Sequence, residues 1–126
     1  MDLKELNITP KSNEGAWCTL EHPVTGEELD IQIKLAGTDS DIYRETIRKQ
    51  INRRLKKGIK RLSLEETENE NLELLVACTL DWKNVVYEGE PLECTPENVK
   101  FIYSQFPWIK EQVDDFIGDR ANYLKN

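Results

Sequence analysis

Residues 29–35 alternate between apolar and polar side chains with the period of two that a half-buried strand shows. The apolar positions are Leu29, Ile31, Ile33 and Leu35, and the polar ones are Asp30, Gln32 and Lys34. Residues 16–21 form a second run, and Pro23 and Gly26 supply turn chemistry between the two. The pattern predicts a β-hairpin over residues 15–36. Because an isolated hairpin is marginal in water, its apolar face is expected to cover helices or to meet another chain.

Residues 39–57 change to a helical period, with apolar side chains four positions apart on one face. These side chains are Tyr43, Ile47, Ile51 and Leu55, with Ile42 beside them. Asp39 and Ser40 are suitable N-cap residues, and Gly58 is a typical helix end. The pattern predicts an amphipathic helix. Its outer face carries Arg44, Arg48, Lys49, Arg53, Lys56 and Lys57.

A second helix is predicted from Ser63 to about Leu80, because Ser63 and Glu66 have the spacing of a capping box. Its apolar residues include Leu72, Leu75 and Val76. Residues 81–91 are expected to form a connector that turns tightly at Glu88-Gly89 and contains a short strand at 85–87.

The apolar positions of residues 99–116 keep helical spacing straight through Pro107. They are Val99, Ile102, Phe106, Ile109, Val113 and Phe116. A proline inside a helix costs about 3 kcal/mol, and it disfavours the helical conformation of the residue before it. At the first position of a new helix the penalty largely disappears. We therefore predict two helices, over residues 95–105 and 107–123, each with a proline (Pro96 and Pro107) at its start.

These elements predict an α+β fold that is mostly α, with an N-terminal β-hairpin followed by about four helices. The length of 126 residues fits one domain. Residues 1–14 are expected to be a flexible arm, and residues 15–126 a single domain, with the hairpin at 15–36 and the helical part at 38–126. No apolar run approaches the roughly 20 residues that span a bilayer.

Charge is unevenly distributed along the chain, whose net charge is −7. Residues 44–61 hold nine of the seventeen basic side chains and one acidic side chain, Glu45. This asymmetry fits an internal match with the acidic residues 65–73, or docking onto an acidic protein partner, including another copy. A nucleic-acid-binding or regulatory module that uses the basic helix 44–61 is the alternative. Net acidity and the missing readout motif count against nucleic acid as a partner.

Catalytic and cofactor chemistry finds little support in the sequence. His22 is the single histidine and falls in a predicted turn, and the six glycines form no phosphate-binding motif. Cys18, Cys78 and Cys94 are far apart and form no CxxC pair. We expect no catalytic residue, no cofactor and no metal ligand; a small hydrolase centred on His22 is a third and weaker alternative.

Aromatic and basic side chains are the candidates for partner binding. Phe101 and Trp108 lie off the main apolar stripe of their helices, which is typical of interface residues as well as of packing against the hairpin. The complete set of candidates is Arg44, Arg48, Lys49, Arg53, Trp82, Phe101, Trp108 and Tyr123.

Three segments of the chain resemble the small tail assembly chaperones of long-tailed bacteriophages and prophages. They are LLVACTLDWKNV (74–85), EGEPLECTPENV (88–99) and FPWIKEQVDDFIGDRANYL (106–124). The segment WCTLEHPVTGEELDIQIKLAG (17–37) is similar to the same group, so the resemblance covers about residues 15–124. It rests on overall layout and includes no catalytic signature.

The resemblance implies a non-enzymatic protein of the bacterial host cytoplasm that takes part in virion assembly. Such chaperones bind the tape measure protein, keep it soluble and help to recruit tail tube subunits. They tend to form homo-oligomers, including open spirals, and neither nucleic acid nor membrane is an expected partner. A longer product made by ribosomal frameshift is common in the group, and an A-rich run encoding Leu124-Lys125-Asn126 would permit it. Coding DNA without a slippery heptamer there would count against this hypothesis.

Overall fold

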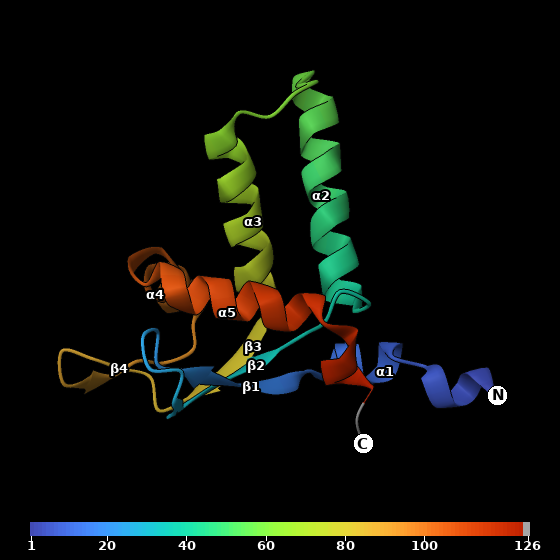
Figure 1. Ribbon diagram of the computed structural model, residues 1–126. Helices are drawn as coiled ribbons and strands as arrows, with labels where there is room; N and C mark the ends of the chain where they lie inside the picture. The colour runs from blue at the N-terminus through green and yellow to red at the C-terminus, as the bar shows by residue number, and fades with distance from the viewer. Residues whose placement is uncertain (125–126) are drawn as a thin grey trace.

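A three-stranded antiparallel sheet forms the base of the structure, and two long helices project from it (Figure 1). The computed structural model describes residues 1–124; the Lys125-Asn126 end of the suggested frameshift region lies outside these residues. Strands β1 (Ala16–Glu21) and β2 (Glu28–Leu35) pair with Cys18 opposite Ile33, so the predicted hairpin is confirmed. The fold is a mixture of helices and small antiparallel sheets, and its five α-helices roughly match the expected number.

The third strand, β3 (Thr79–Lys83), was not predicted from the sequence. It pairs with β2 and places Trp82 opposite Ile33, so that both side chains are buried. The pairing joins segments almost fifty residues apart, and this long-range contact ends the preceding helix earlier than its local pattern indicates. The connector expected from residue 81 therefore begins as a strand.

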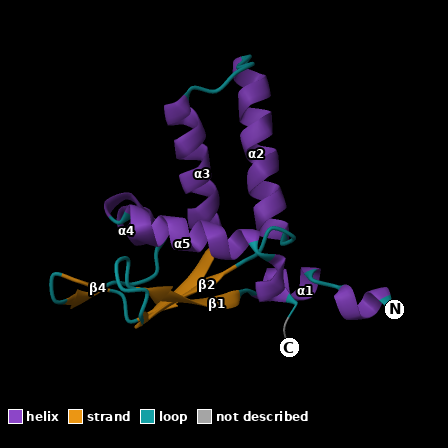
Figure 2. Ribbon diagram, in the orientation of Figure 1, coloured by secondary structure: helices purple, strands orange, loops and turns teal. Residues whose placement is uncertain are grey.

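The two projecting helices are α2 (Asp41–Lys57) and α3 (Leu64–Cys78) (Figure 2). The Ser40 hydroxyl caps α2 by accepting a hydrogen bond from the Tyr43 N–H at 3.2 Å, so the helix begins two residues later than predicted. Gly58 ends α2 with φ 67°, a left-handed conformation that favours glycine. The predicted capping box is confirmed, because Ser63 and Glu66 each accept the other's backbone N–H.

Helices α4 (Pro96–Gln105) and α5 (Pro107–Gly118) confirm that Pro107 starts a new helix. Phe106 separates them with φ −123° and ψ 80°, outside the helical region. Helix α5 ends at Gly118, and residues 120–123, which were expected to continue it, form the 3₁₀ turn η2 (Arg120–Tyr123). In this turn the Asp119 carboxylate accepts the Ala121 N–H at 3.0 Å, which provides a new cap after the helix.

The hydrophobic core lies between the sheet and helices α3, α4 and α5. Its most buried side chains include Leu20, Ile33, Leu35, Leu75, Val99, Val113, Tyr103 and Tyr123. The buried Tyr103 hydroxyl lies 2.6 Å from Thr79 Oγ1, so its polar group has a partner inside the core.

The N-terminal segment includes η1 (Leu3–Leu6) and α1 (Thr9–Glu14), so residues 9–14 are not the loose arm that their polar sequence suggested. Ser12 is fully buried, and its carbonyl accepts the Gly37 N–H at 3.1 Å. Asn13 Oδ1 accepts the Asp41 N–H at 2.8 Å at the start of α2. These two hydrogen bonds, and the close approach of Gly37 to the Ser12 side chain, therefore hold α1 in a place that no apolar pattern predicted.

Strands β4 (Val86–Tyr87) and β5 (Glu90–Pro91) form a small separate hairpin and confirm the short strand expected at 85–87. No helix in residues 1–124 has the length and apolar character needed to cross a membrane. The same residues contain no group of three or more histidine, cysteine or acidic side chains placed to hold a metal ion.

Candidate protein-binding surface

Helices α2 and α3 lie side by side and extend beyond the rest of the molecule, with α5 running across their base (Figure 1). We call α2, α3 and the connecting loop the projection, and residues 51–64 at its outer end the tip. Tyr43 and Ile47, at the base, pack against the core cluster. Ile51 and Leu55 continue the same apolar stripe beyond the body, where they are 44% and 73% exposed. Leu64 is 76% exposed beside them.

The part of α2 that meets α3 beyond the body is polar, and so is the facing part of α3. The first two turns of α3 read LEETENEN, which contains no apolar residue besides Leu64. Gln50, Arg53 and Arg54 of α2 contact α3, so helical geometry turns Leu55 away from the neighbouring helix. The outer part of the projection is held together by polar contacts.

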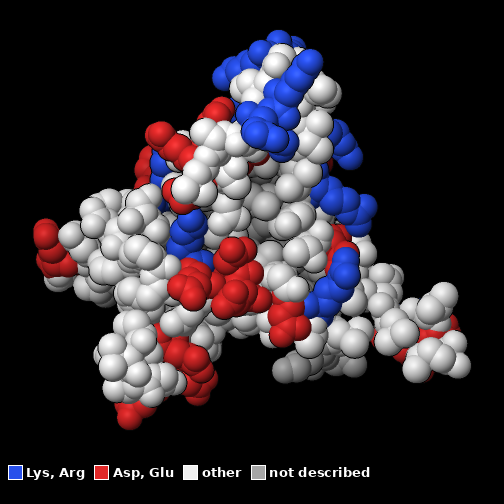
Figure 3. Space-filling view, turned by 45° about the horizontal axis from the view of Figure 1, so that its top comes forward, with Lys and Arg blue, Asp and Glu red and all other residues white. Residues whose placement is uncertain are grey.

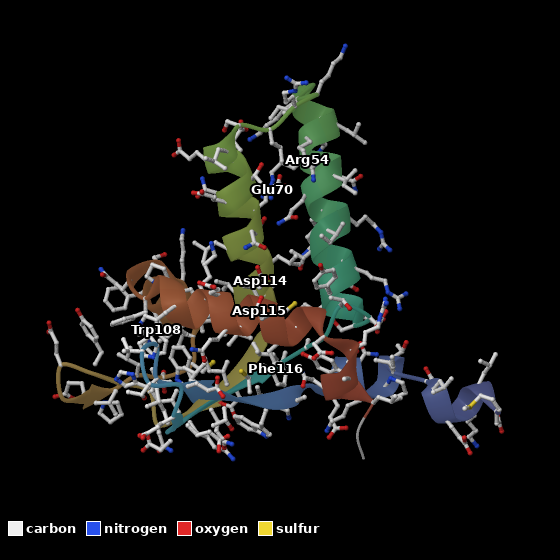
Figure 4. All side chains as sticks on the ribbon, viewed as in Figure 1. Arg54, Glu70, Trp108, Asp114, Asp115 and Phe116 are labelled. Carbon is white, nitrogen blue, oxygen red and sulfur yellow. The ribbon has the colours of Figure 1, made fainter. Side chains whose placement is uncertain are left out.

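Three side chains of α2 make these polar contacts with α3. Gln50 Nε2 donates to the Glu70 carbonyl and to Glu73 Oε1, both at 2.8 Å. Arg53 donates to both carboxylate oxygens of Glu73, at 2.7 and 3.3 Å. Arg54 Nη2 lies 3.2 Å from Glu70 Oε1, and Figure 4 shows this pair between the two helices. These contacts supply, for part of the basic helix, the internal charge match that the sequence suggested.

The paired geometry shifts the titration of Glu73. Hydrogen bonds from the Arg53 guanidinium lower the pKa of the Glu73 carboxyl, and its partial burial opposes this effect. Hydrogen bonding and charge from Glu73 raise the pKa of Arg53 in turn. Both groups therefore remain ionised over the neutral range, and the projection keeps its ion pair there.

Other cations of α2 and the loop remain available for a partner. Within residues 1–124 no ion pair involves Arg48, Lys49, Lys56, Lys57, Lys60 or Arg61. Figure 3 shows basic side chains gathered over the projecting end of the molecule, while acidic side chains form several separate clusters lower down. The tip therefore combines exposed aliphatic side chains with unpaired positive charge.

The surface of the tip is hollowed on both sides of Leu55. One hollow of about 130 Å³ lies between the end of α2 and the loop, and it is lined by Ile51, Arg54, Leu55, Ile59, Lys60, Arg61 and Leu62. A shallower one on the other side is lined by Lys49, Asn52, Arg53, Leu55, Lys56 and Lys57. Lower down, a groove of about 640 Å³ runs between α2, α3 and α4, with Leu72 and Val76 among its lining residues.

The base of α2 is fixed by a bidentate ion pair. Arg120 Nε and Nη2 donate to the two carboxylate oxygens of Asp39 at 2.8 and 2.9 Å, and these hydrogen bonds lower the pKa of Asp39. Arg44 Nη2 donates to the Asp39 carbonyl at 3.1 Å. Asp39 therefore links η2 to the start of α2, and the cap role that the sequence suggested for it belongs to Ser40.

The predicted partner-binding residues separate into two groups. Arg44, Arg48, Lys49 and Arg53 are exposed on α2, with Arg53 engaged by Glu73. Trp82 and Tyr123 are buried, so their assignment to a partner surface is wrong. Trp82 Nε1 donates to the Leu92 carbonyl at 2.8 Å, and the Tyr123 hydroxyl donates to the Leu35 carbonyl at 3.2 Å.

Phe101 and Trp108 lie away from the projection. Phe101 is exposed, and its ring packs edge-on against Tyr87 of β4 at a centroid distance of 5.1 Å. Trp108 is half-buried in the first turn of α5 and packs against the core (Figure 4). The structure thus brings none of the predicted aromatic candidates to the tip.

The residues that sequence reasoning missed are the aliphatic ones of the tip. The sequence placed Ile51 and Leu55 on the apolar stripe of Tyr43 and Ile47, and they were not among the candidates for partner binding. The polar sequence LEETENEN carried a signal, since a polar helix favours a polar face opposite it, here Gln50 and Arg53, and this register turns Leu55 away from α3.

An acidic surface lies on α5, away from the tip. Glu111, Asp114, Asp115 and Asp119 are exposed on α5 and directly after it. Figure 4 shows Asp114 and Asp115 on α5 where it crosses the base of the projection. The tip and the exposed face of α5 therefore carry opposite charges.

His22 has a structural role in the hairpin turn. Its Nδ1 accepts the backbone N–H groups of Val24 and Thr25 at 3.1 and 3.2 Å. These bonds hold the His22 ring against the backbone of the turn.

Comparisons of the chain with protein-family models, with curated proteins and with solved structures give no match. The function is therefore argued from the surface itself.

Proposed function

We propose that the chain is a tail assembly chaperone of a phage or prophage, which binds the tape measure protein, keeps it soluble and helps to recruit tail tube subunits without catalysis. The observation that carries the proposal is the tip, where Ile51 and Leu55 are exposed beside unpaired lysine and arginine side chains. Exposed apolar residues rimmed by charge are typical of protein-binding surfaces. The resemblance of residues 15–124 to this family adds the identity of the partner.

The separation of charge supports self-association as part of the same role. The basic tip of one copy is complementary to the acidic surface of α5 on another. A contact between two different faces is heterologous, and it generates an open spiral when the rotation between subunits does not close. Light scattering over a concentration series, with and without added salt, tests this part; a strict monomer at high concentration would remove it.

Co-expression with a phage tape measure protein tests the chaperone role. We expect the tape measure protein to become soluble and to co-purify with the wild-type chain, and to become less soluble with an Ile51→Ser/Leu55→Ser variant. A Leu3→Ser variant is the matched control, since Leu3 is exposed in η1 at the other end of the chain. A tape measure protein that stays insoluble and does not co-purify with the wild-type chain would contradict the proposal.

A nucleic-acid-binding module that uses helix 44–61 is the second candidate, favoured by the unpaired cations of α2. Phosphate contacts of this kind weaken steeply with salt. A salt-dependent mobility shift with DNA or RNA, together with no effect on any tape measure protein, would favour this candidate.

A further inference from the structure

We infer that the tip binds an acidic, amphipathic α-helix of a partner protein. The inference rests on the proposed function only in taking the partner to be a protein; neither the partner's identity nor a phage context enters it. Leu55 is its centre, because this side chain lines the hollows on both sides of it.

The apolar part of the site has the form of a ridge with a hollow beside it. Leu55 projects on the ridge, and Ile51, Ile59 and Leu62 line the hollow of about 130 Å³. A partner helix binds such a surface by placing apolar side chains spaced three or four positions apart into the recess and along the ridge.

The charged part of the site determines that the partner helix should be acidic. Residues 44–61 contain nine basic side chains and one acidic side chain. Lys60 and Arg61 line the hollow, and Lys56 and Lys57 line the other side of Leu55. A helix that places apolar residues on Leu55 brings its flanking positions close to these cations, where aspartate and glutamate are favoured.

Nucleic acid and anionic lipid fit the tip less well than a protein does. Residues 44–81 contain no phenylalanine, tyrosine or tryptophan, so the surface lacks the rings on which bases stack and that anchor proteins at lipid headgroups.

The test uses the full chain and dye-labelled synthetic peptides of leucine and glutamate, followed by fluorescence anisotropy. The first peptide has leucines at helical spacing and glutamates elsewhere. The second has the same composition without that spacing, and the third replaces glutamate by lysine. A single-stranded oligonucleotide and anionic lipid vesicles are the remaining probes. We expect saturable binding of the first peptide, and affinities at least about tenfold weaker for the second and third.

Two pairs of variants locate the site. We expect Ile51→Ser/Leu55→Ser and Lys56→Glu/Lys60→Glu each to weaken binding of the first peptide by about tenfold or more, as loss of interface anchors does. Leu3→Ser and Lys110→Glu are the matched controls, in η1 and on α5, and should leave the affinity unchanged. Circular dichroism melting of each variant checks that it is folded; all of these positions lie outside the fully buried core.

Each outcome supports or overturns the inference. Equal binding of all three peptides, no binding of the first, or unchanged affinity in folded tip variants overturns it. Tighter binding of the oligonucleotide or the vesicles than of the first peptide, lost in Lys56→Glu/Lys60→Glu, also overturns it and assigns the cations to phosphate. Peptide binding without any effect on a tape measure protein supports the inference and removes the proposed function. A tape measure protein solubilised equally by Ile51→Ser/Leu55→Ser leaves the function standing and overturns the inference.

Discussion

The side chain of Gln112 on α5 forms two hydrogen bonds with the backbone of Glu21 at the end of β1. Oε1 accepts the Glu21 N–H at 2.8 Å, and Nε2 donates to the Glu21 carbonyl at 2.9 Å. The amide thus takes the place of a neighbouring strand at the outer edge of the sheet, because β1 pairs only with β2. Exposed strand edges promote pairing between chains, and this contact covers one end of such an edge.

Replacing Gln112 should therefore have two effects. We expect Gln112→Met, which keeps the length and loses both hydrogen bonds, to lower the free energy of unfolding by about 1 kcal/mol and to increase association through β1. Urea denaturation and sedimentation measure the two effects. Gln112→Glu keeps the acceptor and loses the donor, so its stability should fall between that of the wild type and that of Gln112→Met. A Gln112→Met variant as stable as the wild type would show that the contact contributes little.

Gly37 is a position where any side chain is too large. A Cβ there would lie 2.7 Å from Ser12 Oγ and 3.0 Å from Tyr123 Cε2, so we expect Gly37→Ala to destabilise the fold by about 1–3 kcal/mol. Thermal melting tests the change. Gly118→Ala is the control, because a Cβ at Gly118 meets no atom within 4 Å. Equal melting temperatures for the two variants would contradict the close approach.

Ser12 supplies the complementary test of the same contact. Its buried Oγ has no hydrogen-bond partner among the described residues. We expect Ser12→Ala to be neutral or stabilising, because it removes an unpaired polar atom from the interior. In the Gly37→Ala background it should recover part of the lost stability, since the nearest clashing atom is gone. A further loss of stability in the double variant would exclude this geometry.

Acid should weaken the attachment of α2 at both ends. Hydrogen bonds from Arg120 lower the pKa of Asp39, and those from Arg53 lower the pKa of Glu73. Their ionised forms thus favour folding above the ordinary pKa values of 3.8 and 4.5, and this contribution is lost as the pH falls through the lower values of the folded state. We expect the urea midpoint to decrease below about pH 4.5.

A variant without the titrating group checks the cause of this acid sensitivity. Glu73→Gln should be less stable than wild type at pH 7 by about 0.2–1 kcal/mol, the usual size for an exposed pair. Its stability should then fall less on acidification. Parallel curves for the two proteins from pH 7 to acid would show that Glu73 does not contribute to the loss.

The buried thiols should be unreactive in the folded chain. Burial raises the pKa of Cys78 to about 12 and, with the charge of Glu21, that of Cys18 to about 11. Cys94, half-buried, has a pKa raised to about 11 by burial and by Asp81. Because the thiolate is the nucleophile, we expect slow reaction with a disulfide reagent at pH 8, first at Cys94. Cys94→Ser should remove this first phase; rapid reaction of the variant would contradict the packing.

Local signals in the sequence predicted much of the fold. The capping box at Ser63, the left-handed end at Gly58 and the helix start at Pro107 depend on neighbouring residues alone, and each is confirmed. The strand containing Trp82 was not predicted because its partner, Ile33, is distant in the chain. The same long-range contact buries Trp82, which explains why its assignment to a partner surface failed.

The sequence predicted the exposed charged residues of the candidate site, but it did not identify the exposed apolar ones. Arg48 and Lys49 are exposed as expected, since charge alone places them in solvent. The environment of Leu55 depends on how far α2 extends beyond the body and on which of its faces meets α3. Periodicity identifies which side chains share a face, and it does not identify what that face meets.

Helix α3 passes into β3 without a loop between them. Thr79 is both the C-cap of α3 and the first residue of β3, and its hydroxyl donates to the Leu75 carbonyl at 2.8 Å while it contacts Tyr103. Mechanically, α3 is a lever arm that is joined rigidly to the sheet. A force applied at the tip is therefore transmitted as torque to the pairing of β2 with β3, and a partner that pulls on the projection works directly against the hydrophobic core.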